Sequence, residues 1–263
     1  MGRVLAVANQ KGGVGKTTTA VSLAAALAIA ERRTLLVDLD AQANSTRALG
    51  FYEDAERPSV YDAISGASSL DDVLVQVDSL PHLFLAPSER DLYGAEVELV
   101  EAEEREYRVR KLLEGVRRRF EFVLIDCPPS LGLLTVNALT AADGVVVPVQ
   151  AEYLALEGIS QLTNTLERVR ASLNPALEIA GIVLTMYDER TLLSRQVLEE
   201  VRSVFGERVF KTVIPRNIRL GEAPSHGKPI FLYDIRSRGA EAYLSLAKEL
   251  LDHEPQSVGP RTE

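Results

Sequence analysis

Two lysines flank a cluster of glycines near the start of the chain, in the segment Asn9–Thr19, which reads NQKGGVGKTTT. Glycines let the backbone wrap closely around an anion, because they have no side chain to obstruct it. An apolar run precedes the cluster and an alanine- and leucine-rich stretch follows it, so the N–H groups at the start of a helix would face the same anion. Lys16 supplies a positive charge for the β- and γ-phosphates of a nucleotide, and the Thr17 hydroxyl suits Mg²⁺. The segment therefore predicts a phosphate-binding loop formed by Lys11, Gly12, Gly13, Val14, Gly15, Lys16, Thr17 and Thr18.

This loop is a variant of the common pattern G-x-x-x-x-G-K-[ST], which would place its first glycine at position 10. That position is Gln10. The alternative, a glycine turn with an incidental lysine, is disfavoured because a strand-like run and a helix-like stretch stand in the right order on either side. The common pattern gives no role to the lysine at the start of the loop, Lys11.

Three aspartates stand where apolar runs end. Asp126 does so in FEFVLIDCPPS, and Asp38 and Asp40 do so in TLLVDLDAQANST. Strand ends in open α/β sheets face the crevice in which ligands bind. A phosphate-binding loop needs a second carboxylate for its metal ion, and Asp126 is placed to supply it. We expect Asp38 to support the Mg²⁺ shell and Asp40 to orient the attacking water; the alternative is that both are solvated turn residues.

The composition limits the class of protein. Apolar residues make up 46% of the 263 residues, enough for a full core. No apolar run reaches the roughly 18–20 residues of a membrane span, and no secretory signal opens the chain, so we expect a soluble cytoplasmic protein. The single cysteine, Cys127, argues against a disulfide framework and is expected to be a small buried residue rather than a nucleophile. Three scattered histidines argue against a structural zinc centre.

Charge is unevenly distributed along the chain. The net charge of −9 argues against DNA binding by bulk attraction. From Lys211 to Arg238, however, six basic residues accompany two acidic ones, a local balance of +4 that leaves −13 for the remainder. Such asymmetry can mark one face for a polyanion.

Strand-like apolar runs alternate with helix-like stretches, which indicates βαβ crossovers. We expect an α/β fold of the P-loop NTPase type: a doubly wound, mostly parallel sheet with helices on both faces. A single ATPase domain is expected over residues 1–251, with a disordered polar tail over residues 252–263 and short helices within residues 50–80. The expected strands are Val4–Ala8, Thr34–Val37, Leu83–Ala86, Phe122–Ile125, Val145–Val149, Ile179–Thr185 and Val209–Ile214, and the expected helices are Thr18–Ala30, Glu96–Arg119, Glu157–Leu173, Ser194–Phe205 and Gly239–Leu251.

Together the motifs resemble the ParA/Soj branch of the ParA/MinD ATPases, from Arg3 to about Leu251. The resemblance implies an enzyme that uses ATP (with ADP as product) and Mg²⁺, forms a homodimer around two ATP molecules and binds double-stranded DNA nonspecifically. It also implies a ParB-type centromere-binding partner, chromosome or plasmid partition, a nucleoid-associated location and no membrane partner. The motifs are KGGVGKTT, LLVDLDAQ, FVLIDCPPSLG, VPVQAEYLALEG, LTMYDERTLLSRQV and IPRNIRLGEAPSHGKPI.

The resemblance gives Lys11 a role. It matches the signature lysine of the deviant Walker A loop, which in this family reaches across the dimer to the partner's nucleotide. There it offsets the charge that builds on the transferring phosphoryl group. The alternative is a solvated surface lysine. By matched position, Lys16 and Thr17 bind phosphate and Mg²⁺, Asp126 is the Walker B aspartate, and Asp40 is the switch residue that positions water.

Further matches lie in the second half of the chain. Pro215 and Asn217 match positions that contact adenine, with Met186 as a possible wall. Arg190 and Arg219 match arginines that are implicated in DNA binding in the family, and Arg216 and Lys228 are weaker candidates for the same face. The alternative for all four is that they are ordinary surface residues. One departure concerns the switch loop, where many relatives read D-P-Q-G-N and this chain reads DAQAN from Asp40 to Asn44. Replacing proline and glycine changes the stiffness and the allowed φ values of that loop.

Three other functions fit the sequence less well. A membrane-cycling, MinD-like ATPase needs a basic amphipathic helix at the C-terminus, and LDHEPQSVGPRTE offers none. A nitrogenase-reductase-like protein needs cysteines for an iron–sulfur cluster, and Cys127 alone does not suit. A scaffold that binds ATP without turnover is disfavoured because Lys11, Asp40 and Asp126 are all present.

Overall fold

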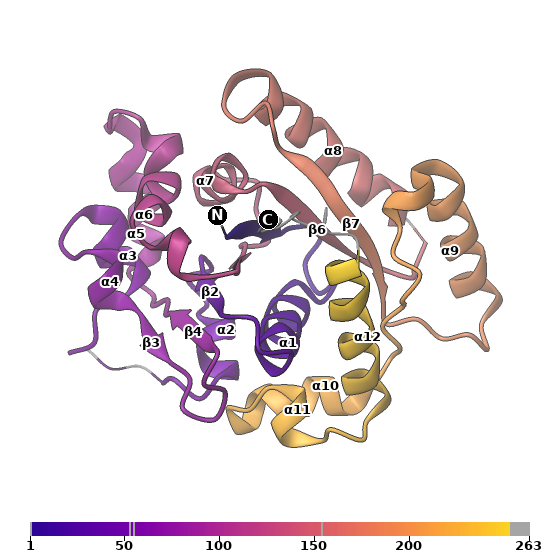
Figure 1. The fold of residues 1–263 in the computed structure, drawn as a ribbon. Coiled ribbons are helices and arrows are strands. Elements are labelled where there is room, and N and C mark those ends of the chain that lie inside the picture. The colour runs from indigo at the N-terminus through magenta and orange to yellow at the C-terminus, as the bar shows by residue number, and fades with distance from the viewer. Residues whose placement is uncertain (1, 53, 55, 154, 253–263) are drawn as a thin grey trace, which may run out of the picture.

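The central element of the computed structural model, which describes residues 2–52, 54, 56–153 and 155–252, is a sheet of seven strands in the order β3-β4-β2-β5-β1-β6-β7 (Figure 1). All neighbouring strands pair in parallel, except that β3 pairs with β4 in antiparallel orientation. The strands are β1 (Arg3–Val7), β2 (Thr34–Asp38), β3 (Val75–Gln76), β4 (Leu83–Ala86), β5 (Phe122–Asp126), β6 (Gly144–Gln150) and β7 (Glu178–Thr185).

Helices cover both faces of this sheet, as Figure 1 shows. On one face pack α1 (Lys16–Ile29), α2 (Asn44–Ala48), α10 (Ile218–Glu222), α11 (Ile230–Tyr233) and α12 (Arg238–Asp252). On the other pack α3 (Val60–Ser65), α4 (Leu70–Val73), α5 (Leu92–Glu98), α6 (Arg108–Val116), α7 (Leu133–Ala141), α8 (Ala155–Ser172) and α9 (Leu192–Phe205). Short 3₁₀ turns occupy Leu99–Glu101, Arg105–Tyr107, Arg117–Arg119, Gly206–Arg208 and Ala223–His226.

The two helical layers explain the continuous apolar runs. Every residue of β2 and of β5 is buried, because each strand contacts helices on both sides. Parallel strands of this kind lack the alternation of polar and apolar residues that marks a half-exposed strand. The doubly wound α/β fold expected from the sequence is therefore confirmed.

The strand register brings the predicted aspartates together. Asp38, at the end of β2, pairs directly with Asp126, at the end of β5. Asp126 also pairs with Val7, the last residue of β1, which leads into the glycine loop. The sheet order changes direction around β1, and this is the position at which open α/β sheets bind ligands. One edge of the sheet therefore holds both the loop and the carboxylates.

The expected strand Val209–Ile214 is wrong as a regular strand. The segment follows β7 through isolated pairs at Ile182–Val209 and Tyr187–Pro215. Between them the backbone N–H groups of Lys211 and Thr212 donate to the two carboxylate oxygens of Glu249, at 2.6 and 2.9 Å. Because a side chain of α12 takes these donors, the ladder with β7 is interrupted.

The expected long helix Glu96–Arg119 is also wrong, because it is broken into separate pieces. The break includes Glu104, whose φ of 50° is left-handed and cannot continue an α-helix. The acidic residues Glu101, Glu103, Glu104 and Glu106 crowd this region, and like charges at helical spacing disfavour a helix.

Smaller differences concern element ends and one omission. The first helix begins at Lys16 rather than Thr18, so the predicted phosphate lysine is itself the first helical residue. Helix α7 was not expected; its polar residues Thr135, Asn137 and Thr140 are buried together with its apolar ones, so the segment gives no amphipathic signal. Asp252, assigned to the tail, is the last residue of α12, and residues 253–263 lie outside the described residues. The short helices expected within residues 50–80 are present as α3 and α4.

Candidate active site

The glycine loop joins β1 to α1 in an anion-binding conformation. Gly13 and Gly15 have φ values of 75° and 88°, which L-residues with side chains adopt only with strain. Gly15 ends the loop as the residue before the first turn of α1, so the free N–H groups of that turn point into the loop. The hydroxyl of Thr185, at the end of β7, donates to the carbonyl of Val14 at 2.8 Å. Thus the end of β7, which is separated from β1 by β6, fixes the loop.

Lys16 occupies the interior of this loop. Its Nζ donates to the carbonyl of Lys11 at 3.1 Å, and only 7% of the residue is exposed. Burial lowers the pKa of Lys16, while the nearby Asp126 and other acidic groups oppose the shift. A buried ammonium group with one neutral partner is poorly compensated. An anion in the loop would supply the missing charge.

Asp126 is a buried carboxylate that lacks full compensation. One oxygen accepts a hydrogen bond from Ser45 at 2.7 Å, whereas Oδ1 has no hydrogen-bond partner among the described residues. Burial raises the pKa of Asp126 to about 8, with Asp38 adding to the shift and the hydroxyls of Ser45 and Thr17 opposing it. An uncompensated buried oxygen of this kind is suited to bind a cation.

Asp38 holds the loop that follows β2. Its Oδ2 accepts hydrogen bonds from the backbone N–H and the hydroxyl of Thr46, at 2.9 and 2.7 Å, and its Oδ1 accepts from the N–H of Asp40 at 3.1 Å. Burial raises the pKa of Asp38 to about 6, against the effect of the Thr46 hydrogen bonds. Asp38 thus positions the switch loop, which leaves Asp126 as the carboxylate with the open oxygen.

These residues fit a magnesium ion. Mg²⁺ in nucleotide sites takes one or two carboxylates and completes its octahedron with phosphates and waters. The orphaned Oδ1 of Asp126 and the Thr17 hydroxyl provide such a partial set. Over the described part of the chain there is no cluster of three or more His, Cys, Asp or Glu side chains able to hold a metal ion on its own. The site therefore suits a cation delivered with a nucleotide.

Replacing Asp126 with asparagine is expected to stabilise the protein in Mg²⁺-free buffer and to remove Mg²⁺-dependent hydrolysis. An unsatisfied buried group costs about 1–3 kcal/mol, and asparagine removes the charge while keeping an acceptor for Ser45. The folded-state pKa of about 8 exceeds the ordinary value of 3.8, so wild-type stability falls as pH rises between these values. The advantage of Asp126→Asn should therefore grow up to about pH 8. Thermal unfolding in EDTA, between the two pKa values, measures the difference in stability between the variant and wild type, and the exposed Asp78→Asn is the control. If Asp126→Asn is less stable than wild type at pH 8, the expectation is contradicted.

Asp40 lies on the switch loop between β2 and α2. It is 8% exposed, and its Oδ1 accepts a hydrogen bond from the N–H of Gln42 at 2.9 Å. Its carbonyl accepts hydrogen bonds from the hydroxyl of Ser88 and from the N–H of Ala43, both at 2.8 Å. Ala43 has a φ of 52°, the left-handed conformation that glycine adopts most readily. The loop thus keeps the backbone turn despite the alanine.

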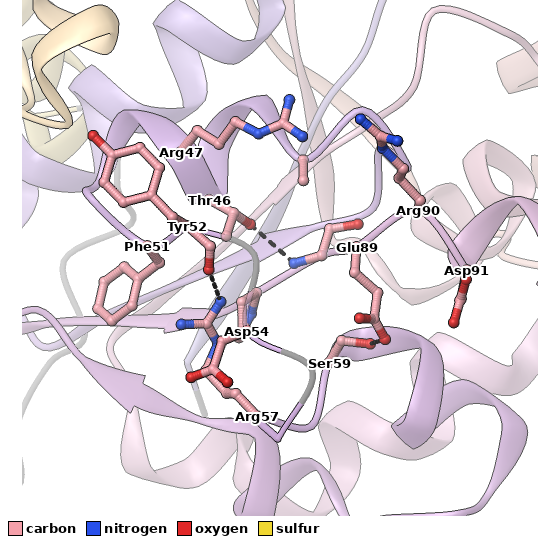
Figure 2. A pocket seen from close by; sticks show the side chains of 13 residues that line it. Thr46, Arg47, Phe51, Tyr52, Asp54, Arg57, Ser59, Glu89, Arg90 and Asp91 are labelled. Atoms are coloured by element: carbon pink, nitrogen blue, oxygen red, sulfur yellow. Dashed lines mark hydrogen bonds between the residues drawn. The ribbon is translucent and has the colours of Figure 1, made fainter.

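A cavity of about 200 Å³ lies beside this loop (Figure 2), and none of the residues that line it belongs to the phosphate loop. The Thr46 hydroxyl accepts a hydrogen bond from the backbone N–H of Ser88. The Ser59 hydroxyl donates to the carboxylate of Glu89, as Figure 2 shows. The first contact joins α2 to the segment after β4, and the second joins the start of α3 to the same segment. The cavity is therefore part of the support of the switch loop.

A second cavity, of about 520 Å³, opens beside the phosphate loop. Gly15 and Thr18 form its floor, and the predicted adenine contacts Met186, Pro215 and Asn217 all line it. Met186 has a φ of 51°, a strained conformation of the kind that gathers at ligand sites. Asn217 caps α10 by accepting a hydrogen bond from the N–H of Arg219 at 2.8 Å. The size and place of the cavity suit a nucleoside whose phosphates reach the loop.

Lys11 points away from its own loop. Its Nζ lies 3.7 Å from a carboxylate oxygen of Glu152, and 40% of its side chain is exposed. The same glutamate lies 4.0 Å from Arg216. Lys16 therefore occupies the loop alone, and Lys11 stands at its open edge.

The four residues predicted to bind DNA are exposed and do not form one bare cationic patch. Arg190 pairs with Asp188 at 2.7 Å, and this pairing lowers the pKa of Asp188 to about 2. Arg219 pairs with Glu222 at 2.8 Å and Asp234 at 3.5 Å. Arg216 faces Glu152, and Lys228 lies just beyond the turn Ala223–His226. The intramolecular partners offset much of the local charge.

Four supporting residues were not predicted from the sequence: Ser45, Thr46, Glu152 and Thr185. Ser45 and Thr46 stand in the motif NST directly after the switch loop, and hydroxyl residues at that distance from two buried carboxylates could have indicated a hydrogen-bond role. Thr185 and Glu152 gave no such signal, because their partners are far away in the sequence.

Comparisons with known proteins agree with this arrangement. A family model described as an AAA domain matches residues 2–179. The chain is 52% identical to the chromosome partitioning protein ParA of Myxococcus xanthus over 251 residues, 95% of this chain and 88% of that one. It is 54% identical to the sporulation initiation inhibitor protein Soj of Bacillus subtilis over 250 residues, 95% and 98% of the two chains.

Solved structures share the fold. A Mycobacterium smegmatis protein named cobyrinic acid a,c-diamide synthase, with bound ADP and magnesium, has a TM-score of 0.84 at 42% identity, covering 96% of this chain and 95% of that one. The cell division ATPase MinD of Pyrococcus furiosus has a TM-score of 0.79 at 26% identity, covering 96% and 99%. Similarity thus extends along nearly the full length of each of these chains.

Proposed function

Since this chain belongs to the ParA/Soj family of chromosome-partitioning ATPases, we propose that it works as an ATP-bound dimer that holds DNA nonspecifically until a ParB-type partner stimulates hydrolysis. The enzyme is an ATPase, and ATP or ADP with Mg²⁺ are its cofactors. When bound, Mg²⁺ would neutralise charge on the phosphates of ATP, and Thr17 and Asp126 are the residues that would hold it. Dimerisation, DNA binding and the partner are the parts that we infer.

The position of Lys11 carries this proposal. Lys16 already fills the loop, so a second cation is not needed for the phosphates of the same chain. Lys11 is half exposed at the open edge, where it can contact the nucleotide of a second copy. A cation offered from a partner subunit stabilises the charge that develops during phosphoryl transfer. A two-fold dimer would place each Lys11 against the partner's triphosphate.

Within each subunit, the remaining chemistry follows from the site. Lys16 and the helix N-terminus bind the phosphates, and Thr17 and Asp126 would hold Mg²⁺. Asp40 would orient the attacking water. The cavity next to Gly15 would hold the base, and Glu222 and Tyr243 also line it.

The DNA face, which comprises Arg190, Arg216, Arg219 and Lys228, would bind DNA through contacts that are individually weak. Ion pairs between exposed side chains contribute little, so Arg219 and Arg190 can exchange their acidic partners for phosphates at small cost. Dimerisation would double the number of phosphate contacts, and each one releases counterions. The turn after α2 closely approaches this face, where Gly50 meets Gly227. DNA affinity would then depend on the nucleotide state.

The cysteine of this chain is not placed for nucleophilic catalysis, which requires an accessible and activated thiol. Cys127, the chain's only cysteine, is 1% exposed, and burial raises its pKa. No helix in the part of the chain that the structure describes combines the length and the hydropathy of a membrane span.

Replacing Arg219 with glutamate is expected to weaken binding to nonspecific duplex DNA in the presence of ATP by at least about tenfold, while the ATP-dependent dimer remains. Each subunit loses a phosphate contact and gains a repulsive charge, and the slope of log affinity against log salt should fall by about one per lost contact. The DNA affinity and its salt dependence are measured by fluorescence anisotropy at several salt concentrations, with ATP, with ADP and without nucleotide. Arg118→Glu, with the same charge change on the exposed 3₁₀ turn Arg117–Arg119, is the control. Equal DNA retention by Arg219→Glu and wild type would remove this face from the proposal.

A further inference from the structure

One carboxylate of α10 lies between the nucleoside cavity and the DNA face. Glu222, the last residue of α10, lines the cavity of about 520 Å³ beside the phosphate loop, and it is the one acidic residue among the described residues that line it. The same side chain pairs at 2.8 Å with Arg219, which belongs to the DNA face. Asp234, the second acidic partner of Arg219, lies 3.5 Å from it and does not line the cavity. Glu222 therefore belongs to both sites, whereas Asp234 belongs to one.

The two carboxylate oxygens of Glu222 are unequally occupied. Oε2 accepts hydrogen bonds from Nη1 of Arg219, at 2.8 Å, and from the hydroxyl of Tyr233, at 3.0 Å. Within the described part of the chain, Oε1 accepts none. The hydrogen bond from Arg219, with that from Tyr233, holds the pKa of Glu222 below its ordinary value, so the group is an anion at neutral pH. Because α10 and α11 hold Oε2 and the side chain is 40% exposed, Oε1 is left to accept a donor from a ligand.

The place of Glu222 along the cavity matches the sugar of a nucleotide. Asn217, the residue before α10, lies at the end of the cavity that we assign to the base. Leu220 lines this cavity and also a narrow second one beside Thr17 and Thr18 of the phosphate loop. Glu222 thus stands on the part of α10 that runs from the base toward the phosphates, and the ribose joins these two parts of a nucleotide. A carboxylate is the acceptor that dinucleotide-binding folds use for a ribose hydroxyl.

We propose that Oε1 of Glu222 accepts a hydrogen bond from a ribose hydroxyl of the bound nucleotide, and that this bond loosens Arg219 for DNA. The inference rests on the proposed function, because it assigns a shared residue to the nucleotide site and the DNA face. A carboxylate shares its negative charge between both oxygens, so a donor on Oε1 weakens the bonds that Oε2 makes. Arg219 then exchanges Glu222 for a DNA phosphate more readily. Coupling between two binding sites is reciprocal, so DNA at Arg219 also strengthens the hold on the ribose.

This coupling acts in every nucleotide-bound state, because ADP and ATP carry the same ribose. The dimer, which needs the triphosphate, adds a second set of phosphate contacts to it. When the cavity is empty, the charge of Glu222 is left to Arg219 and Tyr233. Loss of nucleotide and separation of the dimer therefore both favour release of DNA.

The first experiment measures the affinity of the full chain for ADP and for 2′,3′-dideoxy-ADP, each with Mg²⁺, by isothermal titration. Wild type should bind the dideoxy compound at least about tenfold more weakly, since a charged acceptor loses its donor. Glu222→Gln keeps the size of the side chain and removes its charge, and it should reduce this difference to less than about threefold. Equal affinity of wild type for the two compounds would overturn the ribose contact.

Asp234→Asn is the matched control, because it takes an equal charge from the surroundings of Arg219 but lies outside the cavity. It should keep the wild-type difference between ADP and dideoxy-ADP. If Asp234→Asn loses that difference as well, the effect comes from the charge around Arg219 and not from a contact of Glu222 with the ribose, which overturns the proposal.

The second experiment measures binding to nonspecific duplex DNA by fluorescence anisotropy, with saturating ATP or 2′,3′-dideoxy-ATP. Sedimentation of the same mixtures gives the dimer concentration, so that affinity is expressed per dimer. With dideoxy-ATP the affinity of wild type should be at least about threefold weaker, and Glu222→Gln should not distinguish the two nucleotides. Equal affinities in wild type, or a difference that persists in Glu222→Gln, would overturn the coupling. If ATP fails to promote DNA binding by wild type while ADP and dideoxy-ADP still differ in affinity, the proposed function is wrong and the ribose contact stands.

Discussion

Replacing Lys16 with alanine is expected to reduce ATP affinity by at least about a hundredfold and to leave no measurable hydrolysis. The side chain is the only ammonium group inside the glycine loop among the described residues, with its Nζ bound to the carbonyl of Lys11. A charged hydrogen bond to phosphate in a buried site contributes about 1.5–3 kcal/mol, and the lost charge also leaves the triphosphate facing Asp126 and Asp40 without compensation. Loss of binding and loss of turnover should therefore appear together.

The folded protein should tolerate this change. Lys16 is buried with its pKa lowered by desolvation, so alanine removes a poorly compensated charge. We expect thermal stability without nucleotide to equal or exceed that of wild type, and the stabilisation by ADP with Mg²⁺ to disappear. Isothermal titration with an ATP analogue and thermal unfolding measure the two effects, with the exposed Lys248→Ala as control. Wild-type affinity in Lys16→Ala would show that the loop does not bind the phosphates.

The local chemistry of the site could be predicted because the residues of each motif are close together in the sequence. The glycine loop combines its residue types and spacing within Asn9–Thr19, and the structure gives it the expected left-handed glycines. Asp38 and Asp126 follow apolar runs, and parallel register alone brings them side by side. In a parallel sheet of this class, the order of the strands is almost enough to place the carboxyl ends of neighbouring strands at one edge.

What could not be predicted depends on contacts between distant segments. Ser45 and Asp126 are 81 positions apart, and Thr185 and Val14 are 171 apart, so nothing local indicates that they meet. The segment Val209–Ile214 has the composition of a strand, yet Glu249 takes two of its backbone donors. Propensity describes a segment by itself, whereas this competition is decided by tertiary packing.

The roles of the two aspartates after β2 show the same limit. Alternation along an extended segment predicts only that Asp38 and Asp40 share one side. In the structure both oxygens of Asp38 are engaged in holding Thr46 and Asp40, which makes it a positioning residue. Asp40 has only one of its carboxylate oxygens engaged, by Gln42, among the described residues. Burial and hydrogen bonds thus separate two residues that the sequence treats alike.

Replacing Asp40 with alanine is expected to lower the rate of ATP hydrolysis by about 10²–10³-fold while ATP affinity changes less than about threefold. Asp40 is placed to orient the attacking water, and positioning of this kind acts on the transition state more than on binding. The switch loop should keep its path, because the carbonyl of Asp40 still accepts hydrogen bonds from Ser88 and Ala43. The variant would then accumulate as the ATP-bound, DNA-associated dimer.

Single-turnover hydrolysis and sedimentation with ATP measure this outcome, with Asp78→Ala, an exposed aspartate before β4, as the control. The comparison with Lys16→Ala separates the two roles, because one variant should lose ATP and the other should retain it. An Asp40→Ala protein that binds ATP as wild type but sediments as a monomer would contradict the proposed dimer. One that hydrolyses ATP at the wild-type rate would contradict the role of Asp40, since the water would then be oriented by another group on the same edge of the sheet.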